Sequence, residues 1–496
     1  MSELRKGDSK FPNIYEINTL VWLNELSEKY QKKITLSNVP DEIFENKFKY
    51  FDAIWLMGVW ERSPSSREIS LNHPGLIKEY KKVFKDFSKD DVVGSPYAVF
   101  YYHVSPELGG KEELEQFRKR LMDMDIKLIL DYVPNHVAID HLWTLEKSNI
   151  FIEGTKEDLE NDPEGYFSRF DKIYAHGKDP YFPPWTDTVQ INAYSDQARR
   201  KTKNTLLSIS DLCDGVRCDM AMLVMNKIFK KTWGDKAGKP PKKDFWGEII
   251  PEVRDKQPNF IFIGEVYWGL EWDLQQQGFD YCYDKTLYER IIGKTPTAVR
   301  NHLRAEWDYQ KKLLRYIENH DEKRVINELG LNASKAAAVI ALTIPGATLI
   351  YDGQMEGYNL KIPVQLQKRP ILKINEDLLQ YYYNLLQISR KIKHQNLNYN
   401  MCEVSNIDSY EYSSENLISS QWKNKYLKYL IVTNFSPYKS KGNVLIKKNP
   451  FGETNWEFND LLNQKTYTYN GKDLERYGLY VELDAWKSHI FEVKRK

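Results

Sequence analysis

The residues best suited to chemistry are carboxylates, histidines and one arginine that follow short apolar stretches. The stretch GVRCDMA (215–221) carries two of them, Arg217 and Asp219. In a β-strand alternate side chains share a face, so these two charges lie on one face while Val216 and Cys218 lie on the other. Burying two charges is costly unless they are paired. The pair is therefore either a structural ion pair or part of a reactive site.

Three more apolar stretches end in ionisable or amide side chains. DYVPNH supplies Asp131, Asn135 and His136, GEV supplies Glu265, and ENHD supplies His320 and Asp321. A single carboxylate at a strand end is often only a helix cap. Several carboxylates that meet at one place raise one another's pKa, which destabilises a fold but suits acid–base catalysis. The set as a whole indicates a reactive site.

Paired carboxylates are the groups that cleavage of a glycosidic bond with retention requires. One attacks the sugar, and the other protonates the leaving oxygen. The nucleophile must be ionised, and a neighbouring arginine favours the ionised form, so we assign Asp219 as the nucleophile. Glu265 is then the acid/base, because burial among carboxylates favours a protonated acid. Asp321 is expected to hold sugar hydroxyls in the transition state.

The elements that would carry these residues alternate between strand and helix. Eight apolar stretches are candidate strands: 14–17, 53–59, 127–133, 215–220, 260–266, 279–284, 315–321 and 348–353. Segments 111–124, 197–209 and 335–344 between them have helical period or propensity. This alternation predicts a (β/α)8 TIM barrel, in which active sites lie at the carboxyl ends of the strands. A doubly wound sheet also alternates, but no Gly-rich phosphate loop follows the first strand.

Two segments do not fit a simple barrel. Residues 140–192 lack helical period and are rich in Gly, Pro and Asp, which predicts an inserted subdomain after the third strand. After residue 394 strand-like stretches are separated by turn residues, which predicts a C-terminal antiparallel β-sandwich over 395–496. The catalytic barrel is then formed by 1–139 and 193–394.

Composition excludes some classes of partner. The 496 residues carry 71 Lys and Arg against 70 Asp and Glu, a net charge of +1 that does not favour nucleic acid or an anionic membrane. Aromatic residues make up 14% of the chain, which weakly supports a carbohydrate substrate. The four cysteines have no metal-site or disulfide spacing, and neither an apolar leader nor an 18-residue apolar run is present. We expect a cytoplasmic protein; the sequence does not indicate its oligomeric state.

The four motifs resemble, in order, the first four conserved regions of the α-amylase superfamily of glycoside hydrolases (family thirteen). The segment IPGATLIYDGQMEG (344–357) is similar to that family's eighth strand and exit loop, and the resemblance spans residues 11–490. It implies a nucleophile at Asp219, an acid/base at Glu265 and a transition-state stabiliser at Asp321. It also implies that the non-reducing-side sugar is bound by Asp131, His136, Arg217 and His320.

The chain departs from the family pattern at several positions. Leu223 stands where many members have a His, and Gln190 stands where calcium-binding members carry an Asp, although Asn135 is present. Loss of a carboxylate weakens a calcium site, so we expect no metal or other cofactor. Three aromatic residues are candidates for contact with the substrate, with core packing as the alternative for each: Tyr97 after the second strand, Trp185 in the insertion and Trp268 after Glu265.

The sequence predicts a retaining enzyme acting on α-glucosidic bonds of an α-glucan or a small α-glucoside. It leaves the acceptor open: a transglycosylase or a phosphorylase would use the same residues. A barrel that only binds sugar, or serves as an interaction subunit, is the alternative from another class. Such relatives typically lose a catalytic carboxylate, whereas Asp219, Glu265 and Asp321 are all present.

Overall fold

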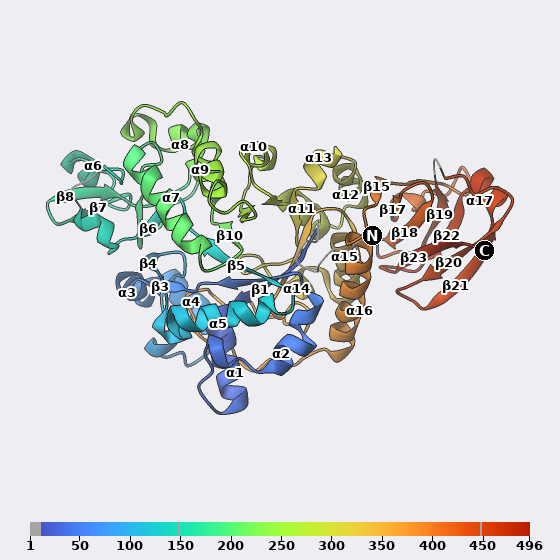
Figure 1. Cartoon of the computed structure of the whole chain (residues 1–496), viewed down its shortest axis with the longest axis horizontal. Coiled ribbons are helices and arrows are strands. Elements are labelled where there is room, and N and C mark those ends of the chain that lie inside the picture. The colour runs from blue at the N-terminus through green and yellow to red at the C-terminus, as the bar shows by residue number, and fades with distance from the viewer. Residues whose placement is uncertain (1–10, 147–148, 447–448) are drawn as a thin grey trace.

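Eight parallel strands close into a barrel at the centre of the molecule (Figure 1). A computed structural model describes residues 11–146, 149–446 and 449–496. Around the barrel the strands follow the order β1, β14, β13, β12, β11, β10, β5, β2. Their bounds are β1 (Asn13–Asn18), β2 (Ala53–Met57), β5 (Lys127–Tyr132), β10 (Gly215–Cys218), β11 (Ile261–Gly264), β12 (Tyr281–Tyr283), β13 (Leu313–Arg315) and β14 (Ala347–Tyr351). The predicted (β/α)8 barrel is confirmed.

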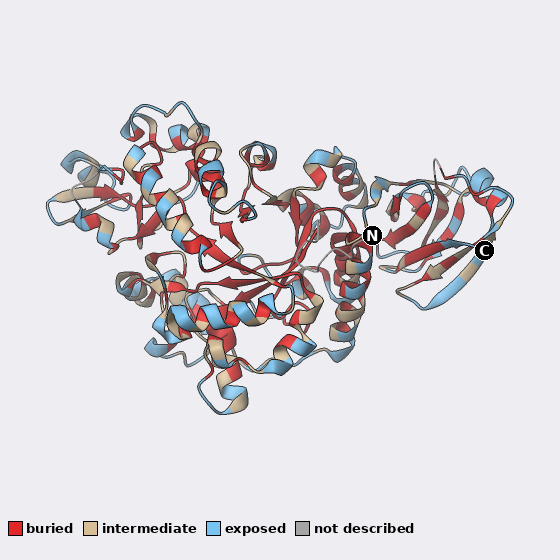
Figure 2. Cartoon of the chain, in the orientation of Figure 1, coloured by how far each residue is buried: buried red, intermediate tan, exposed pale blue. Residues whose placement is uncertain are grey.

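Helices surround the barrel and cover its strands (Figure 1). They include α1 (Thr19–Tyr30), α2 (Asp41–Asn46), α5 (Gly110–Met122), α7 (Asp196–Ser210), α8 (Asn226–Trp233), α9 (Phe245–Arg254), α10 (Glu271–Gln276), α11 (Lys285–Ile292), α12 (Pro296–Leu303), α13 (Trp307–Gln310), α14 (Val325–Leu329), α15 (Leu331–Thr343) and α16 (Glu376–Lys393). In α5 the buried residues Leu114, Phe117 and Leu121 recur every three or four positions, so one face of the helix packs on the barrel. Figure 2 shows this contrast of buried and exposed faces on the outer helices.

The seventh strand differs from its predicted position. The stretch 315–321 was expected to be extended, but β13 covers Leu313–Arg315 and the chain leaves the barrel after Arg315. The reason lies in the polar residues that follow. Glu318 is paired with Arg324 at 2.7 Å, and the Asn319 side chain accepts the backbone N–H of Asp321 at 3.0 Å, so these residues stabilise a loop instead of a strand ladder.

Long connections extend the carboxyl end of the barrel. After β2 the chain forms β3 (Trp60–Arg62), α3 (Pro64–Asn72), α4 (Pro74–Val83) and β4 (Val99–Val104). The connection after β5 begins with β6 (His136–Ala138), and its segment 140–192 holds α6 (Lys156–Asn161), β7 (Tyr166–Arg169), β8 (Lys172–Ala175) and β9 (Thr188–Gln190). The connection from β14 to α16 contacts the connection from β2 to β5. Val92 and Leu366 form a β-bridge, and the Val93 N–H donates to the Gln365 carbonyl at 2.8 Å.

The C-terminal region forms two antiparallel sheets at one side of the barrel (Figure 1). The six-stranded sheet contains β15 (Asn398–Met401), β17 (Leu417–Lys423), β18 (Leu427–Asn434), β20 (Asn455–Asp460), β21 (Lys465–Asn470) and β23 (Ser488–Arg495); the smaller sheet contains β16 (Glu403–Ser405), β19 (Ser440–Leu445) and β22 (Leu479–Leu483), and α17 (Gly471–Tyr477) lies between β21 and β22. Both sheets contribute to one apolar core, for example Leu430 and Val481, which confirms a β-sandwich. The Trp422 indole donates to the Thr343 carbonyl of α15 at 2.7 Å and so joins this unit to the barrel.

We propose residue 395 as the limit between the barrel and the C-terminal sandwich, because α16 ends at Lys393 and β15 begins at Asn398. Within the described ranges of the chain, no helix combines the length and the apolar character that crossing a membrane requires.

Candidate active site

A cleft of about 720 Å³ opens at the carboxyl end of the barrel. Its lining joins strand-end residues to side chains from the long connections. The predicted site residues on its wall are Tyr97, His136, Trp185, Asp219, Glu265 and Asp321. Helix α3 adds Ile69, helix α4 adds Leu76, His73 between these helices also lines the cleft, and the β14–α16 connection adds Gln365. Residues from six connections therefore meet at one place, as expected of an active site on this fold.

Arg217 lies beneath the cleft and holds two of the carboxylates. The alternation of β10 turns Arg217 into the barrel, where it is completely buried. Its Nη1 lies 2.7 Å from Asp219 Oδ1, and its Nη2 lies 2.7 Å from Glu265 Oε2. Its Nε donates to the Tyr283 hydroxyl at 3.2 Å. One guanidinium thus places the two carboxylates side by side.

The charge state of Asp219 is set by opposing effects. Burial raises the pKa of Asp219 to about 7. The Arg217 guanidinium lowers that pKa, as the sequence indicated, but the Glu265 carboxylate raises it again. The arginine does not dominate, because its charge is shared between two acids. Asp219 consequently gains and loses its proton near neutral pH.

Glu265 is held in place from three directions. Arg217 binds Oε2, the backbone N–H of Met220 also donates to Oε2 at 2.7 Å, and the Tyr267 hydroxyl donates to Oε1 at 2.7 Å. Met220 follows the predicted nucleophile and has a left-handed backbone, with φ of 42°, which is unusual for a residue other than glycine. This turn brings the N–H of Met220 to Glu265 and couples the positions of the two acids.

Asp321 is the most accessible of the three carboxylates, with 48% of its side chain exposed. Its Oδ2 lies 3.0 Å from His320 Nε2, and the Tyr97 hydroxyl lies 2.8 Å from the same nitrogen. Burial alone would raise the pKa of Asp321, but the charge and hydrogen bond of His320, together with the charges of Arg217 and Lys361, hold that pKa below its ordinary value. Asp321 is therefore ionised where it meets the cleft.

Two of the expected binding residues differ in their access to the cleft. Asp131 is buried below the cleft wall, where it accepts hydrogen bonds from the Trp55 indole at 3.0 Å and from the Gly58 N–H at 2.7 Å. Burial raises the pKa of Asp131 to about 6. His136 borders the cleft, its ring centroid lies 5.1 Å from that of Trp185, and burial lowers the pKa of His136 to about 4. His136 is thus neutral at pH 7.

Trp268 lies beside the cleft and not among the residues that line it. It is 39% exposed, and its ring packs edge-on against Tyr181 of the insertion with centroids 4.9 Å apart. Its backbone φ is 63°, so a left-handed turn holds the ring at the rim. Leu223, which stands where many relatives have a His, is buried in the core.

The residues at the expected calcium position do not fit a cation. The side-chain nitrogen of Gln190 donates to three oxygens, Asn135 Oδ1, the Asn135 carbonyl and the Ile191 carbonyl, each at 2.9 Å. These are the kinds of oxygen that calcium would take as ligands. The side-chain N–H₂ group of Gln190 lies among these oxygens, already donates hydrogen bonds to them, and would repel a cation.

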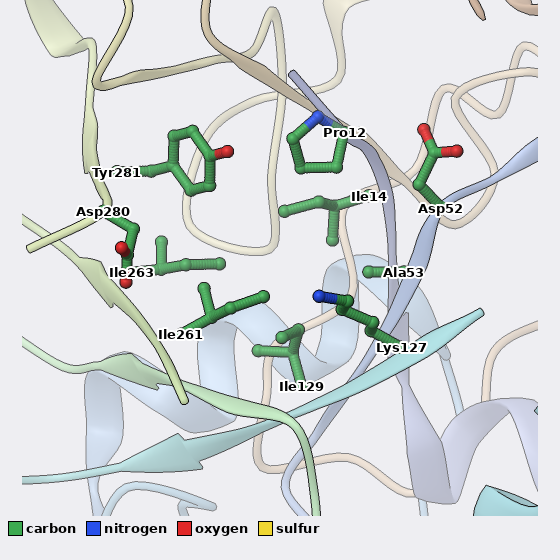
Figure 3. Close-up of a pocket in the computed structure, with 10 residues that line it drawn as sticks. All are labelled: Pro12, Ile14, Asp52, Ala53, Lys127, Ile129, Ile261, Ile263, Asp280 and Tyr281. Carbon is green, nitrogen blue, oxygen red and sulfur yellow. The ribbon is translucent and has the colours of Figure 1, made fainter. Parts of the chain in front are cut away.

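A second pocket, of about 240 Å³, lies at the opposite end of the barrel (Figure 3). Its sides are mainly aliphatic, with Ile14, Ile129, Ile261 and Ile263 pointing into it (Figure 3). Its acids are paired: Asp280 lies 2.6 Å from Arg254, and Asp52 lies 3.2 Å from His394. Since residues at this end of a barrel generally serve stability, we place the active site in the larger cleft.

Several residues that the structure brings to the site lie outside the catalytic motifs of the sequence. They are Glu16, Trp55, Tyr267, Tyr283 and Gln365. Glu16 offered a signal, since a carboxylate within the apolar stretch IYEI is unusual. Tyr267, Tyr283 and Gln365 offered none, because tyrosine is abundant in this chain and the β14–α16 connection has no regular pattern.

The fold and the cleft define a class: a (β/α)8 barrel with three carboxylates that follow β10, β11 and β13, and an arginine between two of them. The family model of the α-amylase catalytic domain matches residues 51–369, more than half of the chain. The chain belongs to the α-amylase family of glycoside hydrolases.

Known relatives and structures agree with this family. The α-amylase MalA of Haloarcula japonica is 29% identical over 277 residues, which are 52% of this chain and 35% of that protein. Alpha-amylase 3 of Dictyoglomus thermophilum is 22% identical over 319 residues, which are 58% of this chain and 59% of that protein. The chain thus matches less than two thirds of the length of either relative. The α-amylase from Geobacillus thermoleovorans, solved with acarbose, shares the fold with a TM-score of 0.67, 16% identity and complete coverage of both chains.

Proposed function

We propose that the protein is a retaining glycoside hydrolase that cleaves α-glucosidic bonds in an α-glucan or a small α-glucoside. The observation that carries this proposal is the placement of Asp219 and Glu265 on adjacent nitrogens of one buried guanidinium. That arrangement supports the short separation of carboxyl groups that retention needs. Membership of the α-amylase family supports the choice of α-glucosides.

In the first step Glu265 donates its proton to the glycosidic oxygen while an Asp219 oxygen attacks the anomeric carbon. The bond from the anomeric carbon to the leaving oxygen breaks, and the departing sugar keeps the proton as a hydroxyl. The product of this step is a glycosyl ester on Asp219. Arg217 and Tyr267 bind the Glu265 carboxylate that remains and so stabilise it.

In the second step Glu265 takes a proton from water, and the water oxygen attacks the anomeric carbon from the opposite face. The ester bond breaks, Asp219 is restored as a carboxylate, and two inversions give an α-configured product. Asp321 accepts hydrogen bonds from sugar hydroxyls in both steps, which strengthen as positive charge develops on the sugar ring. Tyr97, His136 and Trp185 supply the remaining wall for that sugar.

We place the protein in the cytoplasm as part of this proposal. Its four cysteines are free and buried in the described structure, as expected in a reducing compartment.

The test is a product assay by proton NMR with maltooligosaccharides, isomaltose, sucrose and trehalose, each with and without phosphate. We expect sugar released first as the α-anomer, no product from Asp219→Asn, and ordinary product from the matched control Asp235→Asn, whose side chain is fully exposed. Initial release of the β-anomer would overturn the mechanism. New oligosaccharides or a sugar phosphate would instead assign the protein to the transglycosylases or phosphorylases. Absence of turnover with every substrate would favour a barrel that binds sugar without cleaving it.

A further inference from the structure

A buried glutamate on the first barrel strand contacts the site from below. Glu16 belongs to β1 and is completely buried. Ile14, two positions earlier, points into the barrel interior (Figure 3), so Glu16 shares that inward face. Its Oε1 is hydrogen-bonded to Nδ1 of His320, a residue 304 positions away. The contact links the strand that opens the barrel to the loop that carries Asp321.

His320 is thereby held between two carboxylates. Glu16 is bound to Nδ1, while Asp321 Oδ2 lies 3.0 Å from Nε2. Each carboxylate accepts a hydrogen bond, so each ring nitrogen must carry a proton, and only the imidazolium has both. Although burial favours the neutral ring, the two carboxylates raise the pKa of His320 to about 10. The indole ring of Trp55 packs edge-on against the imidazole, with centroids 5.7 Å apart, and limits its rotation.

A glutamate at position 16 is also expected to lower the stability of the fold. Its second oxygen, Oε2, is buried and has no hydrogen-bond partner within the described residues. A buried carboxylate with half of its hydrogen-bonding capacity unmet destabilises a fold. Its presence therefore requires an explanation other than stability. A neutral side chain would fill the space without that cost, so packing alone does not explain the charge.

We propose that Glu16 is a positioning residue of the active site: its carboxylate fixes the orientation of His320 and keeps it an imidazolium, and His320 in turn orients Asp321 and keeps it ionised against the sugar. The proposal rests on the proposed role of Asp321 in glycoside cleavage. Glu16 does not touch the substrate in this account, since His320 and Asp321 lie between it and the cleft.

Other charged and titratable groups surround this chain of contacts and bear on any pH dependence. The groups that act on Glu16, His320 or Asp321 are Tyr97 from the β2–β5 connection, Asp131 from β5, Arg217 from β10, Asp219 directly after β10, Tyr267 after β11, Tyr283 from β12, Glu318 from the β13 loop, Tyr351 from β14 and Lys361 from the β14–α16 connection. Among the groups named here, Glu16 and Asp321 are the two carboxylates that contact the His320 ring directly. Removing the charge of Glu16 therefore weakens the hold on the His320 proton more than a change at the more distant groups.

The first measurement is an NMR titration of the unaltered protein labelled with ¹³C at histidine Cε1. The chain has nine histidines, and the signal absent from His320→Gln identifies His320. We expect His320 to remain an imidazolium beyond about pH 8. A His320 signal that is already neutral at pH 7 would overturn the proposal, whatever the enzyme does with any substrate.

The second measurement uses Glu16→Gln, which keeps an oxygen acceptor for Nδ1 but removes the charge. We expect the pKa of His320 to fall by about one to two units, from about 10 to about 8 or 9. The kcat should then fall by about tenfold at pH 10, but by less at pH 7, where His320 is still protonated. The matched control is Glu318→Gln, which removes a buried carboxylate paired with Arg324 two positions before His320. Glu318→Gln should shift the His320 titration much less than Glu16→Gln does, because Glu318 does not contact the His320 ring.

These readouts separate this proposal from the proposed function. If no glycoside is cleaved but the His320 titration shifts in Glu16→Gln, the contact stands and the assignment as a hydrolase fails. If Glu16→Gln lowers kcat equally at every pH and leaves the His320 pKa unchanged, Glu16 has only a packing role. Should Glu16→Gln not fold, the titration of the unaltered protein still decides the charge of His320.

Discussion

Arg217 Nη1 and Asp219 Oδ1 lie 2.7 Å apart, and the second terminal nitrogen of the same arginine is bound to Glu265 at 2.7 Å. The proposed nucleophile and the proposed acid are therefore linked through one cation. A change in the charge of either acid therefore alters how strongly the arginine stabilises the ionised form of the other.

Replacing Arg217 with lysine should show how far the site depends on this double contact. A lysine ammonium is a single point charge and cannot bind two carboxylates through a planar fork. We expect Arg217→Lys to fold less stably and to lose about a hundredfold or more in kcat/KM, because one buried acid loses its partner. Steady-state kinetics and thermal unfolding test this. Retention of more than half of the activity would contradict the proposal that the Arg217 guanidinium must bind both carboxylates.

The pH profile of kcat/KM should have its acidic limb near pH 7. Burial raises the pKa of Asp219 to about 7, and the nucleophile must be ionised to attack. We therefore expect kcat/KM on an uncharged α-glucoside to rise with pH up to about 7. An acidic limb near pH 4, the usual range of a carboxyl group, would show that Arg217 dominates over burial in solution.

Asp219→Asn should lower the activity and, above neutral pH, raise the stability of the fold. A carboxyl whose pKa is raised on folding stabilises the fold below its unfolded pKa, and this contribution is lost as the pH rises through about 7. Asparagine cannot ionise, so the variant avoids that loss. We expect kcat to fall by about three orders of magnitude or more, and Tm relative to the unaltered protein to increase between pH 4 and pH 8. A Tm difference that is the same at both pH values would show that Asp219 ionises as readily folded as unfolded.

The barrel and the three carboxylates were predictable because both depend on local patterns. Alternating strand and helix identified seven of the eight strands within a few residues, and the strand ends gave Asp219, Glu265 and Asp321 in order. The seventh strand was misplaced because buried residues such as Tyr316 and Ile317 continue past it into a loop. Apolar character alone does not distinguish a strand from a buried loop.

The contacts between distant segments were not predictable from the sequence. The residue pairs Glu16–His320 and Tyr97–His320 are 304 and 223 positions apart, and closure of the barrel is what brings them together. The position of Trp268 at the rim depends on a left-handed turn whose geometry its neighbours in sequence do not reveal. The pKa of Asp219 likewise depends on burial, which the sequence could suggest but not measure.

Tyr267 offers a test of how the acid is held. Its hydroxyl donates to Glu265 Oε1 at 2.7 Å, which stabilises the carboxylate left after proton transfer. We expect Tyr267→Phe to lower kcat about tenfold on a maltooligosaccharide, whose leaving group needs the proton, and to have little effect on α-glucosyl fluoride, whose leaving group does not. Equal loss on both substrates would mean that Tyr267 shapes the sugar site and not the acid.

Gln190 should make the fold independent of calcium. Its side-chain nitrogen donates to Asn135 Oδ1 and to two backbone carbonyls, all at 2.9 Å, and so occupies the centre of an oxygen cage. We expect neither calcium nor a chelator to change the Tm of the unaltered protein. In Gln190→Glu an oxygen replaces that nitrogen, so the cage loses its donor and gains a charge. The variant should lose about 2–3 kcal/mol in chelator and recover part of it in millimolar calcium. Gln190→Ala, which lacks both donor and charge, should be destabilised without responding to calcium. A calcium-dependent Tm in the unaltered protein would show that the amide does not replace the cation.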